Sequence, residues 1–296
     1  MSTYKIHRYA RSIVNFLYVM LRGKLSFGNE KYTVNGIFIN RLLLRYTQET
    51  RKDAVYEASL ESKQGIFIDV GANVGQTMIK VLSMDKDRAY LGFEPQIDCC
   101  SYIEGFIKQN GLQGHLILPF GLSNKNGFVE LLKRSCDGDG SASVIKGFRP
   151  DDFYKTKQYI YVVQGDDIIR ELKLPQISIV KIDVEGSELE VVEGLHETLK
   201  QFSPVVIFEV LNHYLAATKQ QLDEATISFR EKRLAVLENT LRNLGYSIYN
   251  IQSSDRIVEV TQIQPRISSD LSITDYLAIH EKDKGLFLNS YKGSVM

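Results

Sequence analysis

The chain has 296 residues, with 44% hydrophobic and 24% charged side chains, which allows one large α/β domain with an extension. Its 36 basic and 36 acidic side chains cancel, so global charge gives no reason to expect a nucleic-acid partner. The three cysteines, Cys99, Cys100 and Cys136, lack the spacing of a zinc site, and we interpret them as reduced thiols of a cytoplasmic protein.

The N-terminal segment is basic, and the first acidic residue of the chain is Glu30. An apolar run at residues 13–21 is too short to span a bilayer, and no signal-peptide cleavage site follows it. Two interpretations stay open. The run forms a helix that packs on the domain or on a second subunit, or it forms a basic amphipathic helix on an anionic membrane, which would make the protein membrane-associated.

Two elements are expected between this segment and the first core strand. Residues 32–40 alternate enough for a strand or a hairpin around Asn35-Gly36. Residues 47–62 are expected to form a polar helix that leads into the core.

The stretch from Gly65 to Gly75 has the pattern of a strand and a glycine loop, and a helix follows it. The apolar run at 66–68 is typical of a buried parallel strand, and apolar residues recur at helical spacing from Thr77. Gly71 and Gly75 would let the backbone approach a ligand, and the helix N-terminus offers free N–H groups. This unit is interpreted as the opening of a nucleotide-binding βαβ layer.

The loop differs from the dinucleotide fingerprint Gly-x-Gly-x-x-Gly. Asp69 precedes Gly71 by two positions, and Asn73 lies between Gly71 and Gly75. This Asp-x-Gly-x-x-x-Gly spelling resembles the loop of S-adenosylmethionine-dependent methyltransferases, where it packs against the methionine part of the cofactor. The alternative is a turn that only joins a strand to a helix.

Two further positions are candidates for nucleotide contacts. The second strand, residues 88–93, ends at Glu94 and Pro95, about 20 residues beyond the glycines, where a carboxylate can accept both ribose hydroxyls. A third strand is expected at 114–120. After it, Ser123 and Asn124 either read the edge of an adenine or form a polar turn.

The middle of the chain is expected to form a smaller β unit. Residues 128–132 and 143–146 are interpreted as a hairpin around the loop at 137–140, which lacks the spacing of an EF-hand and is read as a flexible turn or lid. A strand is expected at 159–163. Asp166 and Asp167 are expected to cap a helix at 168–172.

The stretch from Ile177 to Gly186 combines a strand with charged residues of one parity. A lysine inside a buried strand is costly unless it is paired, so Lys181 is expected to pair with a neighbouring carboxylate. Asp183 and Glu185 would then lie at the carboxyl edge of the sheet, where open α/β folds bind ligands.

The C-terminal part is expected to complete the sheet. A fifth strand at 204–210 contains the acid Glu209, helices follow at 211–221 and 227–244, and Gly245 ends the second helix. The final antiparallel strands are expected at 246–251 and 276–280.

With these motifs placed, residues 65–280 resemble the FkbM family of S-adenosylmethionine-dependent methyltransferases. The landmarks are Asp69-Val70-Gly71-Ala72-Asn73-Val74-Gly75, Phe93-Glu94-Pro95 and Lys181-Ile182-Asp183-Val184-Glu185-Gly186. The resemblance implies a class I, Rossmann-like α/β fold, a seven-stranded mostly parallel sheet with helices on both faces. Residues 60–285 would form this domain, between a basic helical extension at 1–59 and a tail at 286–296.

The resemblance also implies methyl transfer to oxygen, often a hydroxyl of a sugar, a glycan or another secondary metabolite. Asp183 and Glu185, held by Lys181, are the candidate bases, and His213 is a further candidate. Asp183 is also counted among the expected cofactor contacts. Glu209 would join Asp183 in holding the acceptor or, in a metal-assisted variant that we do not favour, a divalent ion. Two rivals stay open: a nicotinamide (NAD) oxidoreductase and a non-catalytic cofactor-binding scaffold.

Overall fold

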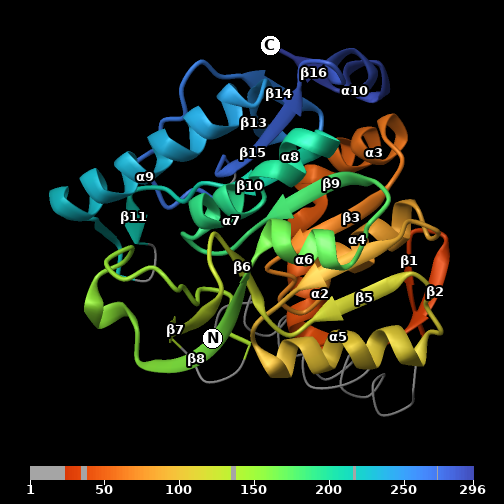
Figure 1. The fold of residues 1–296 in the computed structure, drawn as a ribbon, viewed down its shortest axis with the longest axis horizontal. Coiled ribbons are helices and arrows are strands. Elements are labelled where there is room, and N and C mark those ends of the chain that lie inside the picture. Colours follow the sequence, from red (N-terminus) through yellow and green to blue (C-terminus); the bar gives the residue numbers. More distant parts are fainter. Residues whose placement is uncertain (1–23, 35–38, 135–137, 216–217, 272) are drawn as a thin grey trace, which may run out of the picture.

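The parallel strands that the sequence predicts lie at the centre of one large sheet (Figure 1). The computed structural model describes residues 24–34, 39–134, 138–215, 218–271 and 273–296. The basic N-terminal run, the apolar stretch at 13–21 and Cys136 lie outside these ranges, so the membrane and packing interpretations of the N-terminus stay predictions. Among the described residues, no helix is both long and apolar enough to cross a membrane.

Nine strands form the sheet within the described residues. In spatial order they are β16 (Ser294–Val295), β14 (Arg256–Glu259), β13 (Tyr246–Ser253), β15 (Asp275–His280), β10 (Val205–Glu209), β9 (Ile177–Ile182), β3 (Ile66–Val70), β4 (Tyr90–Phe93) and β5 (His115–Leu118). The five strands from β10 to β5 are parallel, and β15 runs antiparallel to β10 and β13. The predicted α/β fold is confirmed, and β14 and β16 extend the edge beyond the expected seven strands.

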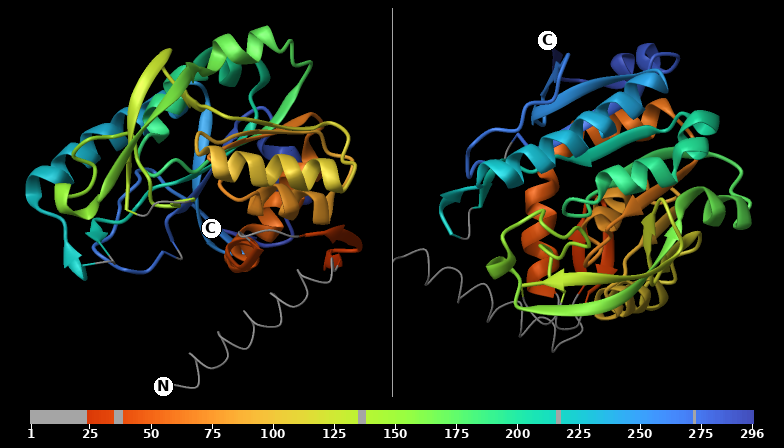
Figure 2. Two further views of the ribbon diagram at one scale, coloured as in Figure 1. Left: turned by 90° about the horizontal axis from the view of Figure 1, so that it is seen from below. Right: turned by 60° about the vertical axis from the view of Figure 1, so that its left-hand side comes forward.

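Helices cover both faces of the sheet (Figure 2). Side chains alternate along β3: Phe67 packs with the helices of one face and Ile68 with those of the other. The first group is α3 (Asp53–Ser62), α4 (Gln76–Met84), α5 (Ile97–Gln109) and α10 (Lys284–Ser290). The second group is α6 (Gly165–Glu171), α7 (Glu188–Gly194), α8 (His196–Phe202) and α9 (Glu224–Asn243).

A second, three-stranded sheet stands beside the carboxyl edge of the large one. Its order is β6 (Gly121–Ser123), β8 (Thr156–Gln164) and β7 (Gly127–Lys133), and a short helical turn, η2 (Asp151–Phe153), precedes β8. The predicted pairing of residues 128–132 with 143–146 is wrong, because β7 pairs along its length with β8. Ser143 contributes only an isolated bridge to Leu132.

The elements before the core differ from the predicted ones. A hairpin joins β1 (Lys24–Phe27) to β2 (Glu30–Thr33) and has Gly28 in its turn, whereas the turn predicted at Asn35-Gly36 lies outside the described residues. Gly28 has φ of +59°, which glycine adopts without strain. The single helix expected at 47–62 is interrupted: α2 (Ile39–Gln48), a short turn η1 (Glu49–Lys52) and α3 follow one another.

The helix expected at 211–221 is also wrong. The segment contains the two-residue strands β11 (Tyr214–Leu215) and β12 (Gln220–Gln221). Tertiary hydrogen bonds override local propensity here, since the Asn212 amide donates to the carbonyls of Ser268 and Asp270.

Two other sequence expectations have different outcomes. Asp166 does not cap its own helix, because its carboxylate accepts hydrogen bonds from the backbone N–H groups of Glu197 and Thr198 at the start of α8. The domain division stays a prediction. The expected boundary after residue 59 falls inside α3. Near the C-terminus, α10 packs on α3, and β16 pairs with β14.

Candidate active site

The glycine loop between β3 and α4 packs against the end of β9. Gly71 has φ of +85°, and a side-chain carbon there would lie 2.0 Å from the carbonyl oxygen of Asp183. Gly75, with φ of +81°, is the N-cap residue just before α4. Glycine is therefore required at position 71 by a contact within the chain, in addition to any approach of a ligand.

Glu94 ties the end of β4 to this loop. Its carboxylate accepts hydrogen bonds from the backbone N–H groups of Asn73, at 2.7 Å, and Gln96, at 2.9 Å. The side chain is buried, and burial raises its pKa to about 7 in spite of these hydrogen bonds. Glu94 therefore changes its charge near neutral pH, at a position predicted to hold a ribose.

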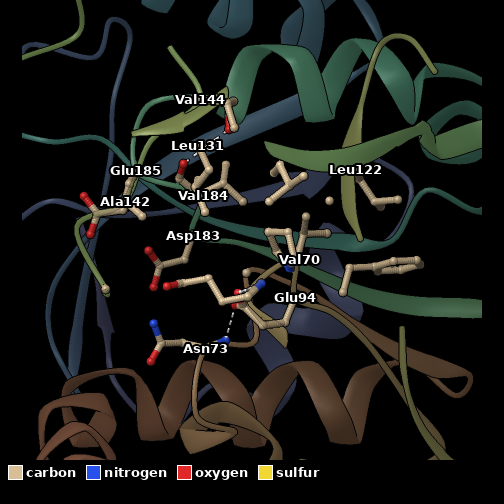
Figure 3. Close-up of a pocket in the computed structure, with 18 of the residues that line it drawn as sticks. Val70, Asn73, Glu94, Leu122, Leu131, Ala142, Val144, Asp183, Val184 and Glu185 are labelled. Carbon is tan, nitrogen blue, oxygen red and sulfur yellow. Dashed lines mark hydrogen bonds between the residues drawn. The ribbon is translucent and has the colours of Figure 1, made fainter. Parts of the chain in front are cut away.

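One pocket collects six of the twelve predicted site residues (Figure 3). Its lining includes Gly71, Asn73, Glu94, Pro95, Asp183 and Glu185. It also includes Gln76, and the side-chain oxygens of Asn73 and Gln76 are buried with no hydrogen-bond partner among the described residues. Buried polar atoms are rarely left unpaired in native proteins, so these two oxygens indicate a place for a ligand that donates hydrogen bonds.

Four predicted cofactor contacts lie outside that lining, namely Asp69, Gly75, Ser123 and Asn124. Ser123 ends β6, and the Asn124 amide donates a 2.6 Å hydrogen bond to Glu193 of α7. Their neighbours Gly121 and Leu122 do line the pocket. The contact of Ser123 and Asn124 with an adenine stays a prediction.

Lys181 is a buried lysine that lies between two carboxylates, one of which lines the pocket. Only 1% of its surface is exposed, and its ammonium lies 3.2 Å from Asp69 and 3.3 Å from Asp183. The predicted pairing of Lys181 is therefore confirmed. Burial alone would lower the pKa of Lys181, but the two carboxylates raise it overall, so the lysine stays charged. Asp69 also accepts a 2.6 Å hydrogen bond from the Tyr90 hydroxyl.

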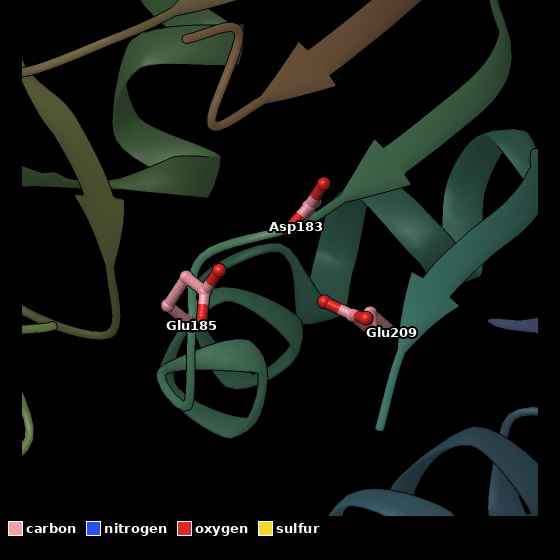
Figure 4. A group of neighbouring side chains, drawn as sticks. All are labelled: Asp183, Glu185 and Glu209. Carbon is pink, nitrogen blue, oxygen red and sulfur yellow. The ribbon is translucent and has the colours of Figure 1, made fainter. Parts of the chain in front are cut away.

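Three carboxylates meet at the carboxyl ends of β9 and β10 (Figure 4). One oxygen each of Asp183, Glu185 and Glu209 lies within 4.8 Å of the others. Glu185 also pairs with Arg149, and Glu209 accepts a 2.9 Å hydrogen bond from the Thr274 hydroxyl. This set of hard oxygen atoms has the chemistry to bind a divalent cation or the hydroxyls of an acceptor.

The pKa values of these acids move in different directions. Burial and the neighbouring acids raise the pKa of Glu209 well above its usual value. Burial also raises the pKa of Glu185, against the opposing effect of Arg149. Burial alone would raise the pKa of Asp183 too, but the positive charges of Lys181 and Lys52 lower it overall. Asp183 is thus the weakest base of the three.

His213 lies in a neighbouring pocket that shares Glu209 with the carboxylate group and also contains Arg230. The ring is 4% exposed, and its Nε2 lies 3.4 Å from a Glu231 oxygen. Burial and the charge of Arg230 lower the pKa of His213, so the ring is neutral at neutral pH. The structure therefore brings Asp183 and Glu185 together in one pocket and places His213 in the next.

Sequence reasoning missed several residues of the first pocket, among them Arg45, Gln76 and Gln96. Gln96 directly follows Glu94-Pro95, and its amide exchanges hydrogen bonds with the backbone of Asp139. Gln76 follows Gly75, so proximity to the motif was an available signal for both. No local signal marks Arg45, which lies in α2, outside every recognised motif.

Comparisons with known proteins identify a family. A family model, the methyltransferase FkbM domain, matches residues 69–248. The hexuronic acid methyltransferase AglP of Haloferax volcanii is 26% identical over 143 residues, which are 48% of this chain and 54% of AglP. The chain thus spans about half the length of this curated relative.

The solved structures that align with this chain are distant. The methyltransferase FkbM of Methylobacillus flagellatus aligns with a TM-score of 0.41 and 14% identity, over 91% of this chain and 59% of that one. The O-methyltransferase TomG of Streptomyces achromogenes aligns with a TM-score of 0.42 and 12% identity, over 81% of this chain and 89% of TomG.

Proposed function

Because this chain belongs to the methyltransferase FkbM family, we propose that it transfers a methyl group from S-adenosylmethionine to a hydroxyl oxygen of a sugar or glycan. The observation that carries the proposal is the single pocket in which the glycine loop, Glu94 and the carboxylates Asp183 and Glu185 meet. The relative AglP, a hexuronic acid methyltransferase by name, makes an acidic sugar the first acceptor to test.

The residues present suit this cofactor. The unpartnered oxygens of Asn73 and Gln76 match a hydrogen-bond donor such as the ammonium of its amino-acid end. Glu94 stands where a carboxylate can accept the ribose hydroxyls. When bound, S-adenosylmethionine supplies a sulfonium methyl group for an in-line displacement.

The chain then has two tasks. The carboxylate group at the ends of β9 and β10 orients the acceptor hydroxyl toward the methyl carbon, which is worth a large share of the rate. One carboxylate accepts the hydroxyl proton as the new carbon–oxygen bond forms. We assign the proton to Glu185, because its raised pKa makes it a stronger base than Asp183.

Labelling tests the function directly. The protein is incubated with methyl-labelled S-adenosylmethionine and oligosaccharides that contain glucuronic acid, beside the same oligosaccharides with the carboxyl group reduced, and the product is analysed for an O-methyl group. Parallel reactions with EDTA and with added Mg²⁺ decide whether the carboxylate group acts with a metal. No label in these or in fractionated glycans, despite cofactor binding, would favour the scaffold alternative.

The oxidoreductase alternative makes a different prediction about the cofactor. The Asp69-to-Gly75 loop lacks the third glycine of the dinucleotide fingerprint. S-adenosylhomocysteine is therefore expected to raise the melting temperature, because a ligand of the native state stabilises it, whereas NAD is expected to leave it unchanged. The reverse result would replace the proposal with the oxidoreductase.

Glu94 should make cofactor binding depend on pH. Below its pKa of about 7 the side chain is protonated, and the charged form is the better acceptor for two ribose hydroxyls, so affinity should rise between pH 6 and pH 8. Glu94→Gln should weaken binding by about 1.5–3 kcal/mol at pH 8, the worth of hydrogen bonds to a charged group, and flatten this profile.

Calorimetry with S-adenosylhomocysteine measures both effects. Glu104→Gln, at an exposed glutamate of α5 that pairs with Lys108, is the matched control and should behave as the wild type. An unchanged affinity for Glu94→Gln at pH 8 would remove Glu94 from the ribose site.

A further inference from the structure

Arg45 brings a positive charge into the pocket from outside the matched domain. It lies in α2, before residue 69 where the family match begins. Arg45 is the single basic residue among the described residues that line the pocket, where it faces the acids Glu94, Asp183 and Glu185. The motifs recognised in the sequence give this residue no role.

The helix that carries Arg45 is firmly anchored. Leu42 is fully buried, and the Tyr46 ring lies 4.0 Å from the Lys80 ammonium of α4 and 5.0 Å from the Phe27 ring. Arg41, one turn before Arg45, donates a hydrogen bond to the carbonyl of Gly138. These contacts hold α2 against both α4 and the loop at 138–142.

The guanidinium of Arg45 lies against Gly140 of that loop. A side-chain carbon at position 140 would come within 1.6 Å of the Arg45 Nη2 atom. The guanidinium therefore occupies space that is free because residue 140 is glycine. The loop is tied in turn to the cofactor side of the pocket, where Gln96 and Asp139 exchange two hydrogen bonds. Arg45 therefore has a defined place at the pocket wall.

Within the described part of the chain, Arg45 has neither a hydrogen bond nor an ion pair. Two of these acids already have closer cations, since Asp183 pairs with Lys181 and Glu185 with Arg149. Arg45 acts on these two acids only as a more distant charge. A half-buried guanidinium without a partner, beside acids that are already paired, is available to a ligand anion.

We propose that Arg45 binds a carboxylate of the ligand in this pocket. Arginine presents paired N–H donors that match the two oxygens of a carboxylate. The unpartnered oxygens of Asn73 and Gln76 in the same lining accept hydrogen bonds. Together the three side chains match an α-amino acid, with its ammonium on the two amides and its carboxylate on Arg45.

This inference rests on the proposed function, in which two molecules carry a carboxylate. One is S-adenosylmethionine, through its amino-acid end, and the other is an acidic sugar acceptor. Both have the same chemistry toward Arg45, and the experiment separates them.

Calorimetry of Arg45→Met with two probes tests the cofactor source. S-adenosylhomocysteine contains the amino-acid end, and 5′-methylthioadenosine lacks it. Binding of the first should weaken by about 10- to 100-fold, the worth of a hydrogen-bonded charge, while the second binds as to the wild type. Arg45→Lys should retain part of the affinity, because it keeps the charge without the fork of donors.

Steady-state kinetics tests the acceptor source. If both nucleoside probes bind normally, Arg45→Met should raise KM at least tenfold for an oligosaccharide with glucuronic acid and leave KM for its carboxyl-reduced form unchanged. That result also supports carboxylate binding by Arg45.

Two further variants guard against a merely structural effect. Lys108→Met removes an exposed positive charge of α5 that lies outside the pocket lining, and it should bind both probes normally. Gly140→Ala keeps the charge but displaces the guanidinium, and it should reproduce part of the Arg45→Met loss.

Three outcomes would overturn the inference: normal behaviour of Arg45→Met in all assays, equal weakening of both nucleoside probes, or equal loss in Lys108→Met. A wild-type protein that binds neither nucleoside probe would instead overturn the proposed function.

Discussion

Glu185→Gln is expected to lower turnover by about 10²- to 10⁴-fold, the usual worth of a general base, with normal binding of S-adenosylhomocysteine. The amide keeps the shape of the side chain but cannot accept the proton of the acceptor hydroxyl. Burial raises the pKa of Glu185, so turnover of the wild type should fall as the pH is lowered and this carboxylate becomes protonated. In the Glu185→Gln variant, turnover should no longer show this fall at low pH.

Asp183→Asn should differ from Glu185→Gln in kind. Lys181 and Lys52 keep the pKa of Asp183 low in spite of its burial, which makes it a poor base and a good hydrogen-bond acceptor for the substrate. We therefore expect a raised KM for the acceptor and a smaller loss of turnover. Steady-state kinetics with the acceptor identified by labelling separates the two effects. Near-normal turnover in both variants would remove these carboxylates from proton transfer and make His213 the next candidate.

Lys181→Met is expected to lower the free energy of unfolding by about 3–5 kcal/mol, the cost of breaking a buried ion pair from one side. Asp69 is fully buried and would lose the ammonium 3.2 Å away, keeping only the Tyr90 hydroxyl as a hydrogen-bond donor. Urea denaturation at neutral pH measures the loss.

The loss should depend on pH with a definite sign. Burial already raises the pKa of Asp69 above its usual value, and removal of Lys181 raises it further. A carboxyl group with a raised native pKa favours folding most at low pH, and that contribution is lost as the pH rises through the native value. The variant should therefore approach wild-type stability as the pH is lowered and differ most at neutral pH.

A double variant provides the control. Asp69→Asn with Lys181→Met removes both charges, so the double variant should be more stable than Lys181→Met alone. The double-mutant cycle then gives the interaction energy between Lys181 and Asp69. It also keeps the test decisive if Lys181→Met does not fold. A deficit below about 1 kcal/mol, the range of exposed ion pairs, would show that Lys181 does not act as a buried partner of Asp69.

The sequence alone predicts the features whose residues are neighbours in the chain. The strand and glycine loop from Asp69 to Gly75, the acid after the second strand and the Lys181-to-Glu185 alternation each depend on local spacing and backbone conformation. Because Lys181 lies in a buried strand, its charge also required a partner, and the structure confirms this expectation with Asp69 as the partner. These patterns were sufficient for the fold class and for the family.

The tertiary structure decides what comes from distant parts of the chain. Pairing of β9 with β10 brings Glu209 to Asp183, and the loop before η2 brings Arg149 to Glu185. Helix α2, from the expected extension, brings Arg45 to the same pocket. Just before the short strands β11 and β12, Asn212 donates hydrogen bonds to residues more than 50 positions away. A local window contains no record of such partners, because burial, charge and hydrogen bonding at these residues are set by the packing of separate elements.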